Sequence, residues 1–310
     1  MAKYAILGVG ALGGLYGGLL AKSGVETHFL ARSDLDHLQK HGLQVESPWG
    51  NFHVNNLNVY QSPEEMPPAD VVVVAWKATS NPSLPLALEA LCHAQSIVLV
   101  LQNGLDVEHD AAAVVGEDRV LGGCCFLCCN KIAPGHIKHL DYGRIVFGEF
   151  GSQNSGQITH RMQMIASDFR AAGIDIEPSA NLLSVRWKKL AWNIPFNGLS
   201  VVLAANTQEI MEDPAASALA KSLMEEVREA AAANGVAIEA THIQKMLDDT
   251  RRMVPYDSSM LLDFRAGRAM EVEAIFGNPL RAARQAGYNP SKIDMLYQQL
   301  SFLGNRSRTL

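Results

Sequence analysis

Short apolar runs alternate with helical segments through the first half of the chain. Residues 4–7 predict a strand, and residues 11–23 predict the helix that follows it. Further apolar runs rich in β-branched residues predict strands at 27–31, 71–76, 97–101 and 120–129. Runs with so few polar positions are typical of parallel strands that helices cover on both faces. The pattern therefore predicts an α/β domain with a doubly wound, mostly parallel sheet, which is a Rossmann fold.

Weaker patterns complete this first domain and indicate where it ends. Residues 50–62 alternate enough to predict a short strand pair, and residues 144–150 predict a later strand. A helix at 157–172 and a last strand at 174–177 follow. Because strand-like runs stop soon afterwards, we expect the Rossmann domain to cover residues 1–179.

Helical periods dominate the rest of the chain, so we expect a second, all-α domain over residues 180–310. One segment of it predicts a capped helix that begins at Ser258 or Ser259. Glu271 and Glu273 would lie well inside that helix. By themselves these are ordinary helix residues.

Composition and charge limit the possible partners. With 48% hydrophobic and 19% charged residues among 310, the chain has the composition of an ordinary globular protein of two domains. A net charge of −6 argues against a nucleic-acid partner, because such proteins usually present a strongly basic face. The N-terminus lacks the pattern of a signal peptide, and no apolar run reaches the roughly 20 residues that span a bilayer. We therefore expect a cytoplasmic protein with no membrane partner.

Four of the five cysteines are clustered at Cys124, Cys125, Cys128 and Cys129, and the fifth is Cys92. Such a set makes no disulfide framework in a chain of this length, which indicates a reducing compartment. A structural zinc site needs four convergent ligands, whereas neighbours on a strand point to opposite faces. We therefore interpret the cluster as small apolar fillers of a buried strand and expect no metal site.

A glycine fingerprint lies immediately after the first predicted strand and opens the next helix. Gly8 would permit a tight turn, Gly10 the approach of a pyrophosphate, and Gly13 close packing of the helix on the strand. This context favours a dinucleotide site over a structural glycine-rich turn. The predicted cofactor loop consists of Gly8, Val9, Gly10, Ala11, Leu12 and Gly13.

Polar residues after other predicted strands extend this site. A site that prefers NAD would have an acidic residue after the second strand, whereas Arg32 stands there and favours the 2′-phosphate of NADP(H). Asp34 lies two residues further, so NAD and a solvated Arg32 both stay open. Lys77 and Asn103 follow two core strands, at the ends where open α/β sheets bind ligands. Either residue alone could be an ordinary surface residue.

A polar stripe in the second domain suggests the reaction. Lys189, Asn193 and Asn197 lie four residues apart in an apolar segment, hence on one face of a helix. Polar side chains in a buried helix are costly without partners, so this stripe suggests a ligand surface. Hydride delivery to a ketone leaves an alkoxide, for which a lysine and an asparagine supply a proton donor and a fixed dipole. The alternative is a solvated Lys189 beside Lys188.

Taken in order, these motifs resemble the ketopantoate reductase (2-dehydropantoate 2-reductase) family over essentially the whole chain. Besides the glycine loop, the arginine after the second strand and the lysine after VVVVAW, the resemblance rests on QNG, APG, WKKLAWN and SSMLLDFRAGRAMEVE. It implies an NADPH-dependent reduction of 2-dehydropantoate, a small 2-oxo acid, to pantoate. This reaction feeds pantothenate synthesis.

The resemblance also implies roles for individual residues. Lys189 would be the general acid that protonates the alkoxide, Asn193 would hydrogen-bond the same oxygen, and Glu271 would orient lysine and substrate. The implied substrate contacts are Asn103, Lys189, Asn193, Asn197 and Ser259. The implied cofactor contacts outside the glycine loop are Arg32 at the 2′-phosphate, and Lys77 and Asn103 near the nicotinamide.

Two other functions compete with this one. A D-2-hydroxyacid dehydrogenase for another branched 2-oxo acid would share the acid–base and carboxylate-binding groups, so only the pocket and the kinetics would separate the two. A non-catalytic protein that senses NADP(H) and binds a protein partner would need no proton donor beside the nicotinamide. Exposed alanine-rich helices in the second domain are compatible with a homodimer.

Overall fold

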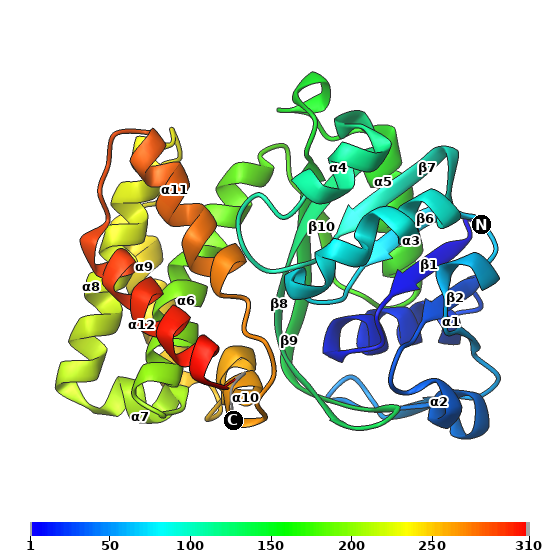
Figure 1. The fold of residues 1–310 in the computed structure, drawn as a ribbon, viewed down its shortest axis with the longest axis horizontal. Coiled ribbons are helices and arrows are strands. Elements are labelled where there is room, and N and C mark those ends of the chain that lie inside the picture. The colour runs from blue at the N-terminus through cyan, green and yellow to red at the C-terminus, as the bar shows by residue number, and fades with distance from the viewer. Residues whose placement is uncertain (1, 308–310) are drawn as a thin grey trace. The chain divides into compact units, whose positions relative to one another are not determined.

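The computed structural model describes residues 2–307, and Figure 1 shows the order of the helices and strands along them. The chain divides into two compact units. The first comprises Met1–Gln102 and Val107–Val185, and the second comprises Asn103–Asp106 and Arg186–Leu310. The four residues 103–106 therefore fold with the second unit, although their neighbours along the chain belong to the first.

A ten-stranded sheet, counted over the described residues, forms the first unit. Its strands are β1 (Tyr4–Leu7), β2 (Thr27–Leu30), β3 (Leu43–Glu46), β4 (Phe52–Val54), β5 (Asn58–Tyr60), β6 (Ala69–Val74), β7 (Cys92–Val100), β8 (Val120–Ala133), β9 (His136–Glu149) and β10 (Ile176–Pro178). Its helices are α1 (Gly18–Lys22), α2 (Leu35–His41), α3 (Leu84–Leu91), α4 (His109–Val115) and α5 (His160–Ala171). Short 3-10 helices lie at Pro63–Glu65, Ala78–Ser83, Glu117–Arg119 and Ser152–Asn154.

The strand order confirms a doubly wound, mostly parallel sheet. It runs β4-β3-β9-β8-β7-β6-β1-β2-β5, and β10 pairs with β9. Strands β5, β2, β1, β6, β7 and β8 are all parallel to their neighbours in this order, whereas β8 and β9 form a long antiparallel hairpin. The clustered cysteines Cys124, Cys125, Cys128 and Cys129 are buried on β8, which confirms that they fill a covered strand.

The strand pair predicted at residues 50–62 is wrong. Both strands exist, but β4 pairs with β3 and β5 pairs with β2, at opposite ends of the sheet. Strand β3, which the periodicity did not identify, supplies the partner of β4. Strands of three residues make too few contacts to stabilise each other as an isolated pair, so each joins a free edge of the larger sheet.

The helix after β1 lies unusually close to the sheet. It begins at residue 11, passes through a π-helical turn, Gly13–Gly17, and continues as α1. A Cβ atom added at Gly13 would overlap the carbonyl oxygen of Gly8, and one added at Gly17 would lie 2.6 Å from the Phe29 ring. These positions therefore admit only glycine without movement of the helix.

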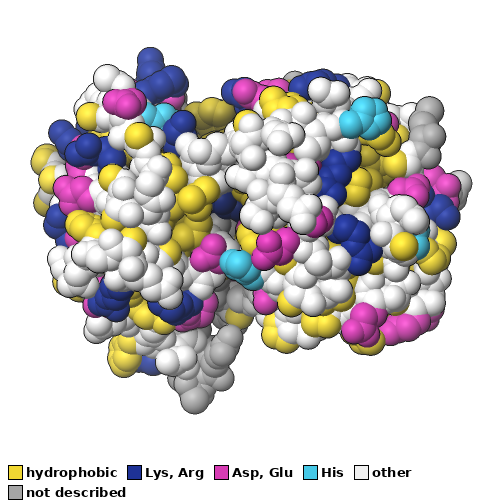
Figure 2. All heavy atoms as spheres, turned by 90° about the horizontal axis from the view of Figure 1, so that it is seen from above, with side chains coloured by type: hydrophobic (Ala, Val, Ile, Leu, Met, Phe, Trp, Pro, Cys, Tyr) yellow, Lys and Arg dark blue, Asp and Glu magenta, His cyan; other side chains and the backbone are white. Residues whose placement is uncertain are grey.

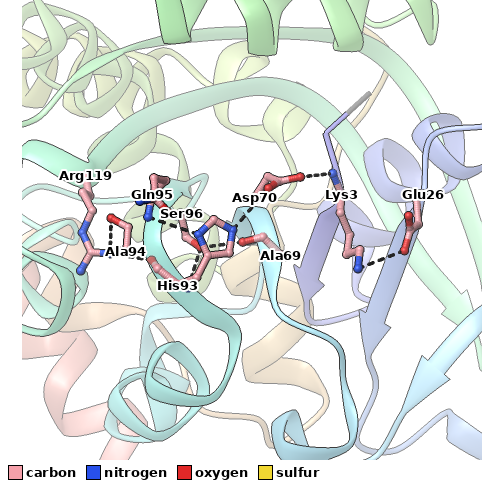
Figure 3. A network of polar contacts seen from close by, with 9 residues as sticks. All are labelled: Lys3, Glu26, Ala69, Asp70, His93, Ala94, Gln95, Ser96 and Arg119. Atoms are coloured by element: carbon pink, nitrogen blue, oxygen red, sulfur yellow. Dashed lines mark hydrogen bonds and ion pairs between the residues drawn. The ribbon is translucent and has the colours of Figure 1, made fainter.

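Polar side chains join the central strands at the edge of the sheet where they begin (Figure 3). The backbone N–H of Lys3 donates to Asp70 Oδ2 at 2.8 Å, and Asp70 Oδ1 lies 3.3 Å from His93 Nε2. Arg119 Nη1 donates to the carbonyl of His93 at 2.9 Å. The buried hydroxyl of Ser96 donates to the carbonyl of Ala69 at 2.6 Å. These contacts hold β1, β6 and β7 together at the edge opposite to the glycine loop.

The described part of the second unit is entirely helical, as the sequence predicts. After α6 (Leu182–Val202), which begins in the first unit, its helices are α7 (Thr207–Glu212), α8 (Pro214–Ala233), α9 (Ala240–Arg252), α10 (Ser259–Arg265), α11 (Asn278–Gln285) and α12 (Ser291–Ser307). A core of its own includes Trp187, Phe196 and Phe276, each fully buried. No helix among residues 2–307 combines the length and the apolar character needed to cross a membrane.

The single helix predicted to contain Glu271 and Glu273 is wrong. Helix α10 is capped by Ser258, whose hydroxyl accepts the N–H of Leu261 at 3.1 Å, and it ends at Arg265. Gly267 then takes a left-handed conformation with φ +64°, which stops the helix. Glu271 lies in the loop that follows, and Glu273 begins a separate π-helical turn, Glu273–Gly277.

We expect Gly13→Ala to lower the free energy of unfolding by about 1–3 kcal/mol, because the added methyl group forces the helix away from the sheet. Urea denaturation measures this change. Gly10→Ala is the matched control, since no heavy atom lies within 4 Å of a Cβ atom added there. An equal loss of stability in both variants would contradict this account of the packing.

Candidate active site

The carboxyl ends of the central strands lie level with one another in the first unit. Leu7, the last residue of β1, pairs with Leu30 at the end of β2 and with Val74 at the end of β6. Val74 in turn pairs with Val100 at the end of β7. The segments that leave these strands therefore start from one edge of the sheet, as the sequence predicts for the glycine loop, Arg32 and Lys77.

The glycine loop has the shape that a phosphate-binding turn requires. Gly8 has φ +97°, a backbone conformation that residues with a side chain rarely adopt. A Cβ atom there would lie 2.9 Å from Cβ of Trp76. Around Gly10 the backbone faces open space, and its carbonyl oxygen accepts the N–H of Gly14 at 2.8 Å to start the helix. The loop thus leaves its middle free for close approach of a ligand to a helix N-terminus.

Arg32 and Asp34, from which the sequence could not decide between NADP(H) and NAD, differ in exposure and in hydrogen bonding. Arg32 is exposed and forms no hydrogen bond or ion pair with the described part of the chain. Asp34 is only 5% exposed, and its carboxylate accepts hydrogen bonds from Lys131, Gly135 and Ser33. Burial disfavours the ionised carboxylate, but these bonds outweigh that effect and hold the pKa of Asp34 below its ordinary value.

A buried amide network supports the segment that carries Lys77. Lys77 directly precedes the 3-10 helix Ala78–Ser83, and within that helix Asn81 Nδ2 donates to Asp110 Oδ2 at 2.7 Å. Gln102 Nε2 donates to Asn81 Oδ1 at 2.6 Å and to the carbonyl of Trp76 at 3.2 Å. Trp76 is also the side chain that packs on the glycine loop. Sequence reasoning did not identify Asn81, and the signal for Gln102 was only its place in the QNG motif.

The polar stripe predicted in the second unit lies on α6. Lys189 is half-buried, whereas Asn193 and Asn197 are 2% and 3% exposed. The Lys189 ammonium lies 5.6 Å from the ring centroid of Trp192, within range of a cation–π interaction. Asn193 Nδ2 donates to Asn103 Oδ1 at 3.4 Å, so two residues 90 positions apart meet here.

Asn103 reaches α6 because its segment docks on the C-terminal helices. The N–H of Leu105 donates to the carbonyl of Ala274 at 3.0 Å, and Asn278 Nδ2 donates to the carbonyl of Leu105 at 2.7 Å. Gly104, with φ +114°, has no room for a side chain because Ala274 covers it. Asn103 therefore sits among the predicted catalytic residues of the second unit.

The two remaining predicted residues, Ser259 and Glu271, lie at or just before the start of helical segments of this unit. Ser259 is the first residue of α10, and its hydroxyl forms no hydrogen bond within the described chain. Its neighbour Ser258 instead binds Ser200, with their hydroxyl oxygens 2.6 Å apart, and Ser200 Oγ donates to the carbonyl of Asn197 at 3.0 Å. Glu271 is 8% exposed, and its carbonyl accepts the N–H of Ile275 at 3.1 Å.

The predicted site residues of the second unit thus supply the ammonium group of Lys189, the buried carboxyl group of Glu271 and several amide and hydroxyl groups. Such a set can bind a carboxylate or keto oxygen and can deliver a proton. Charged side chains elsewhere are mixed: on the face drawn in Figure 2, Lys and Arg are interspersed with Asp and Glu. The described residues contain no group of three His, Cys, Asp or Glu that could hold a metal ion.

Comparisons with known proteins agree with this arrangement. The family model described as Ketopantoate reductase PanE/ApbA matches residues 4–152, and its C-terminal counterpart matches residues 181–304. A 2-dehydropantoate 2-reductase of a Nostoc species is 50% identical over 309 residues, which cover 99% of this chain and 97% of that protein.

Solved structures of other proteins have the same fold. The crystal structure of 2-dehydropantoate 2-reductase from Geobacter metallireducens is similar with a TM-score of 0.93 and 37% identity, over 98% of this chain and 99% of that one. D-mandelate dehydrogenase, solved with NADH and anilino(oxo)acetate, is similar with a TM-score of 0.90 over 99% of both chains. At 20% identity, this second likeness shows a common fold alone.

Asn81→Ala should lower the free energy of unfolding by about 1–3 kcal/mol, because Gln102 and Asp110 lose their buried partner. The measurement is urea denaturation followed by circular dichroism. Ser80→Ala is the control, since the hydroxyl of Ser80 has no hydrogen-bond partner among the described residues. If the two variants lose the same stability, the amide network does not hold this segment.

Proposed function

The chain belongs to the ketopantoate reductase family, and we propose that it reduces 2-dehydropantoate to pantoate with NADPH as the hydride donor. It is an oxidoreductase of the class that acts on CH–OH groups. The proposal includes its place in pantothenate synthesis. A cytoplasmic location and a homodimer stay predictions from the sequence.

The meeting of Asn103 with the polar stripe of α6 carries this proposal. It brings two amides together at the face of α6 that also carries Lys189, and α6 contributes Leu190 and Ile194 to the apolar core of the unit. A protein that only senses NADP(H) has no need for a half-buried lysine on the same helix face as buried amides. A reductase of 2-oxo acids needs both, because the keto oxygen becomes an alkoxide during the reaction.

The residues of the first unit suit a nicotinamide dinucleotide. The open backbone at Gly10 would admit the pyrophosphate, and the exposed guanidinium of Arg32 would pair with a 2′-phosphate. Lys77 would lie near the nicotinamide. When bound, NADPH supplies the hydride that adds to the keto carbon.

The residues of the second unit would complete the reaction. The Lys189 ammonium donates a proton to the oxygen of the former carbonyl, so that the C=O group becomes CH–OH. Asn193 donates a hydrogen bond to the same oxygen, and Glu271 orients the lysine and the substrate. Asn197 and Ser259 hold the hydroxyl or carboxylate end, for which the Ser259 hydroxyl is suited because it has no partner among residues 2–307.

The direct test is the initial rate of NADPH oxidation with 2-dehydropantoate and with a panel of branched and aromatic 2-oxo acids. A rate dominated by 2-dehydropantoate supports the proposal. Turnover of another acid alone would make the protein a D-2-hydroxyacid dehydrogenase for that acid. Tight binding of NADPH without any turnover would make it a sensor.

Lys189→Ala should lower kcat by roughly 10² to 10⁴, the usual contribution of a positioned general acid, and leave the Kd for NADPH unchanged. Steady-state kinetics with 2-dehydropantoate measure the effect. Lys188→Ala removes the same charge from the neighbouring position and should change kcat little. A loss of only a few-fold in Lys189→Ala would exclude the proposed proton donor.

Arg32→Ala should raise the KM for NADPH by roughly 10- to 100-fold, because a charge-assisted, bidentate contact with the 2′-phosphate is lost. The KM for NADH, which lacks that phosphate, should hardly change. The two values are measured with the same substrate at saturation. Similar increases for both cofactors would mean that Arg32 does not bind the 2′-phosphate.

A further inference from the structure

The carboxylate of Asp34 is held by a segment far along the chain. Lys131, near the end of β8, places its ammonium 2.6 Å from each oxygen of Asp34. The backbone N–H of Gly135, in the turn between β8 and β9, donates to Oδ2 at 3.0 Å. Ser33 Oγ donates to Oδ1 at 2.9 Å. Both oxygens of this buried carboxylate are therefore occupied.

The turn that carries Gly135 is fixed against the sheet and α2. Gly135 has φ +59°, and a Cβ atom there would lie 2.6 Å from the ring of His37 on α2. The carbonyl of Gly135 accepts the N–H of Gln44, in β3, at 2.8 Å. Gly135 is thus held in a packed turn, and Lys131 lies in the strand that leads into that turn.

This contact changes what Asp34 can do for a nucleotide. An unpaired acidic residue after the second strand accepts hydrogen bonds from the ribose hydroxyls of NAD and repels a 2′-phosphate. Asp34 lies two residues after Arg32, so their Cα atoms are at most about 7 Å apart. Because Lys131 neutralises Asp34, the exposed Arg32 contributes the uncompensated charge of this short segment.

We propose that Lys131 is a specificity-determining residue that acts through Asp34: it occupies the carboxylate that would otherwise favour NADH and thereby sets the preference for NADPH. This inference rests on the proposed use of NADPH. Lys131 is a positioning residue here, since it acts on the cofactor through Asp34. A residue that only stabilised the fold would affect both cofactors equally.

The test compares dissociation constants for NADPH and NADH, measured by calorimetry without substrate. In Lys131→Met, Asp34 keeps the hydrogen bonds from Gly135 and Ser33 but loses the positive charge that neutralises it. NADPH should therefore bind more weakly and NADH more tightly, and the preference should fall roughly tenfold. Lys138→Met is the matched control, because it removes an exposed lysine from β9 of the same hairpin. The preference should be unchanged in that variant.

A second variant gives the opposite sign. Asp34→Asn leaves the charge of Lys131 uncompensated near Arg32, so the preference for NADPH should rise. In the double variant Lys131→Met and Asp34→Asn both charges are gone, and the preference should return close to that of the original protein. If Lys131→Met does not fold, the rise in Asp34→Asn decides the matter.

The outcomes separate this inference from the proposed function. An original protein that binds NADH as tightly as NADPH would overturn the proposed cofactor and this inference with it. An original protein that prefers NADPH, with an unchanged preference in Lys131→Met and in Asp34→Asn, would overturn only the role of Lys131. Equal weakening of both cofactors in Lys131→Met would likewise assign Lys131 to the fold alone.

Discussion

The close approach of one helix to the sheet is the constraint on which the first unit depends. Side chains at Gly13 and Gly17 would collide with the strand region beneath them, so the helix after β1 lies as near as backbone atoms allow. That proximity requires the chain to turn sharply at Gly8, in a conformation open mainly to glycine. This sharp turn leaves the backbone at Gly10 open. A phosphate can approach a helix N-terminus only where no side chain intervenes.

The two edges of the sheet use their polar groups differently. Where the strands begin, Asp70, His93 and Arg119 bind backbone and side chains of neighbouring strands (Figure 3). Where the strands end, the amides of Asn81 and Gln102 are paired with each other, while Arg32 stays unpaired within the described chain. Paired groups give this edge its shape, and an unpaired guanidinium is available to an anionic ligand.

Asn103 illustrates how the fold assigns a residue to a site. It follows β7, yet the backbone bonds of Leu105 and the tight fit of Gly104 against Ala274 attach its segment to the helical unit. There its side-chain oxygen accepts a hydrogen bond from the buried amide of Asn193. Buried amides are costly when unpaired, so this contact stabilises the segment and also orders the stripe on α6.

The sequence by itself determined the elements and the chemistry that local patterns encode. Apolar runs predicted the core strands, the glycine spacing predicted the turn after β1, and four-residue spacing predicted the stripe of Lys189, Asn193 and Asn197. These signals are local, because periodicity and backbone conformation depend on residues a few positions apart. The family, and with it the enzyme class, followed from the order of those motifs.

Only the tertiary structure decided which distant segments meet. It paired β4 and β5 with strands at opposite ends of the sheet. It also brought Lys131 to Asp34 across 97 positions, which no spacing rule could predict. Such contacts depend on the packing of whole elements, and periodicity along the chain carries no information about which elements become neighbours.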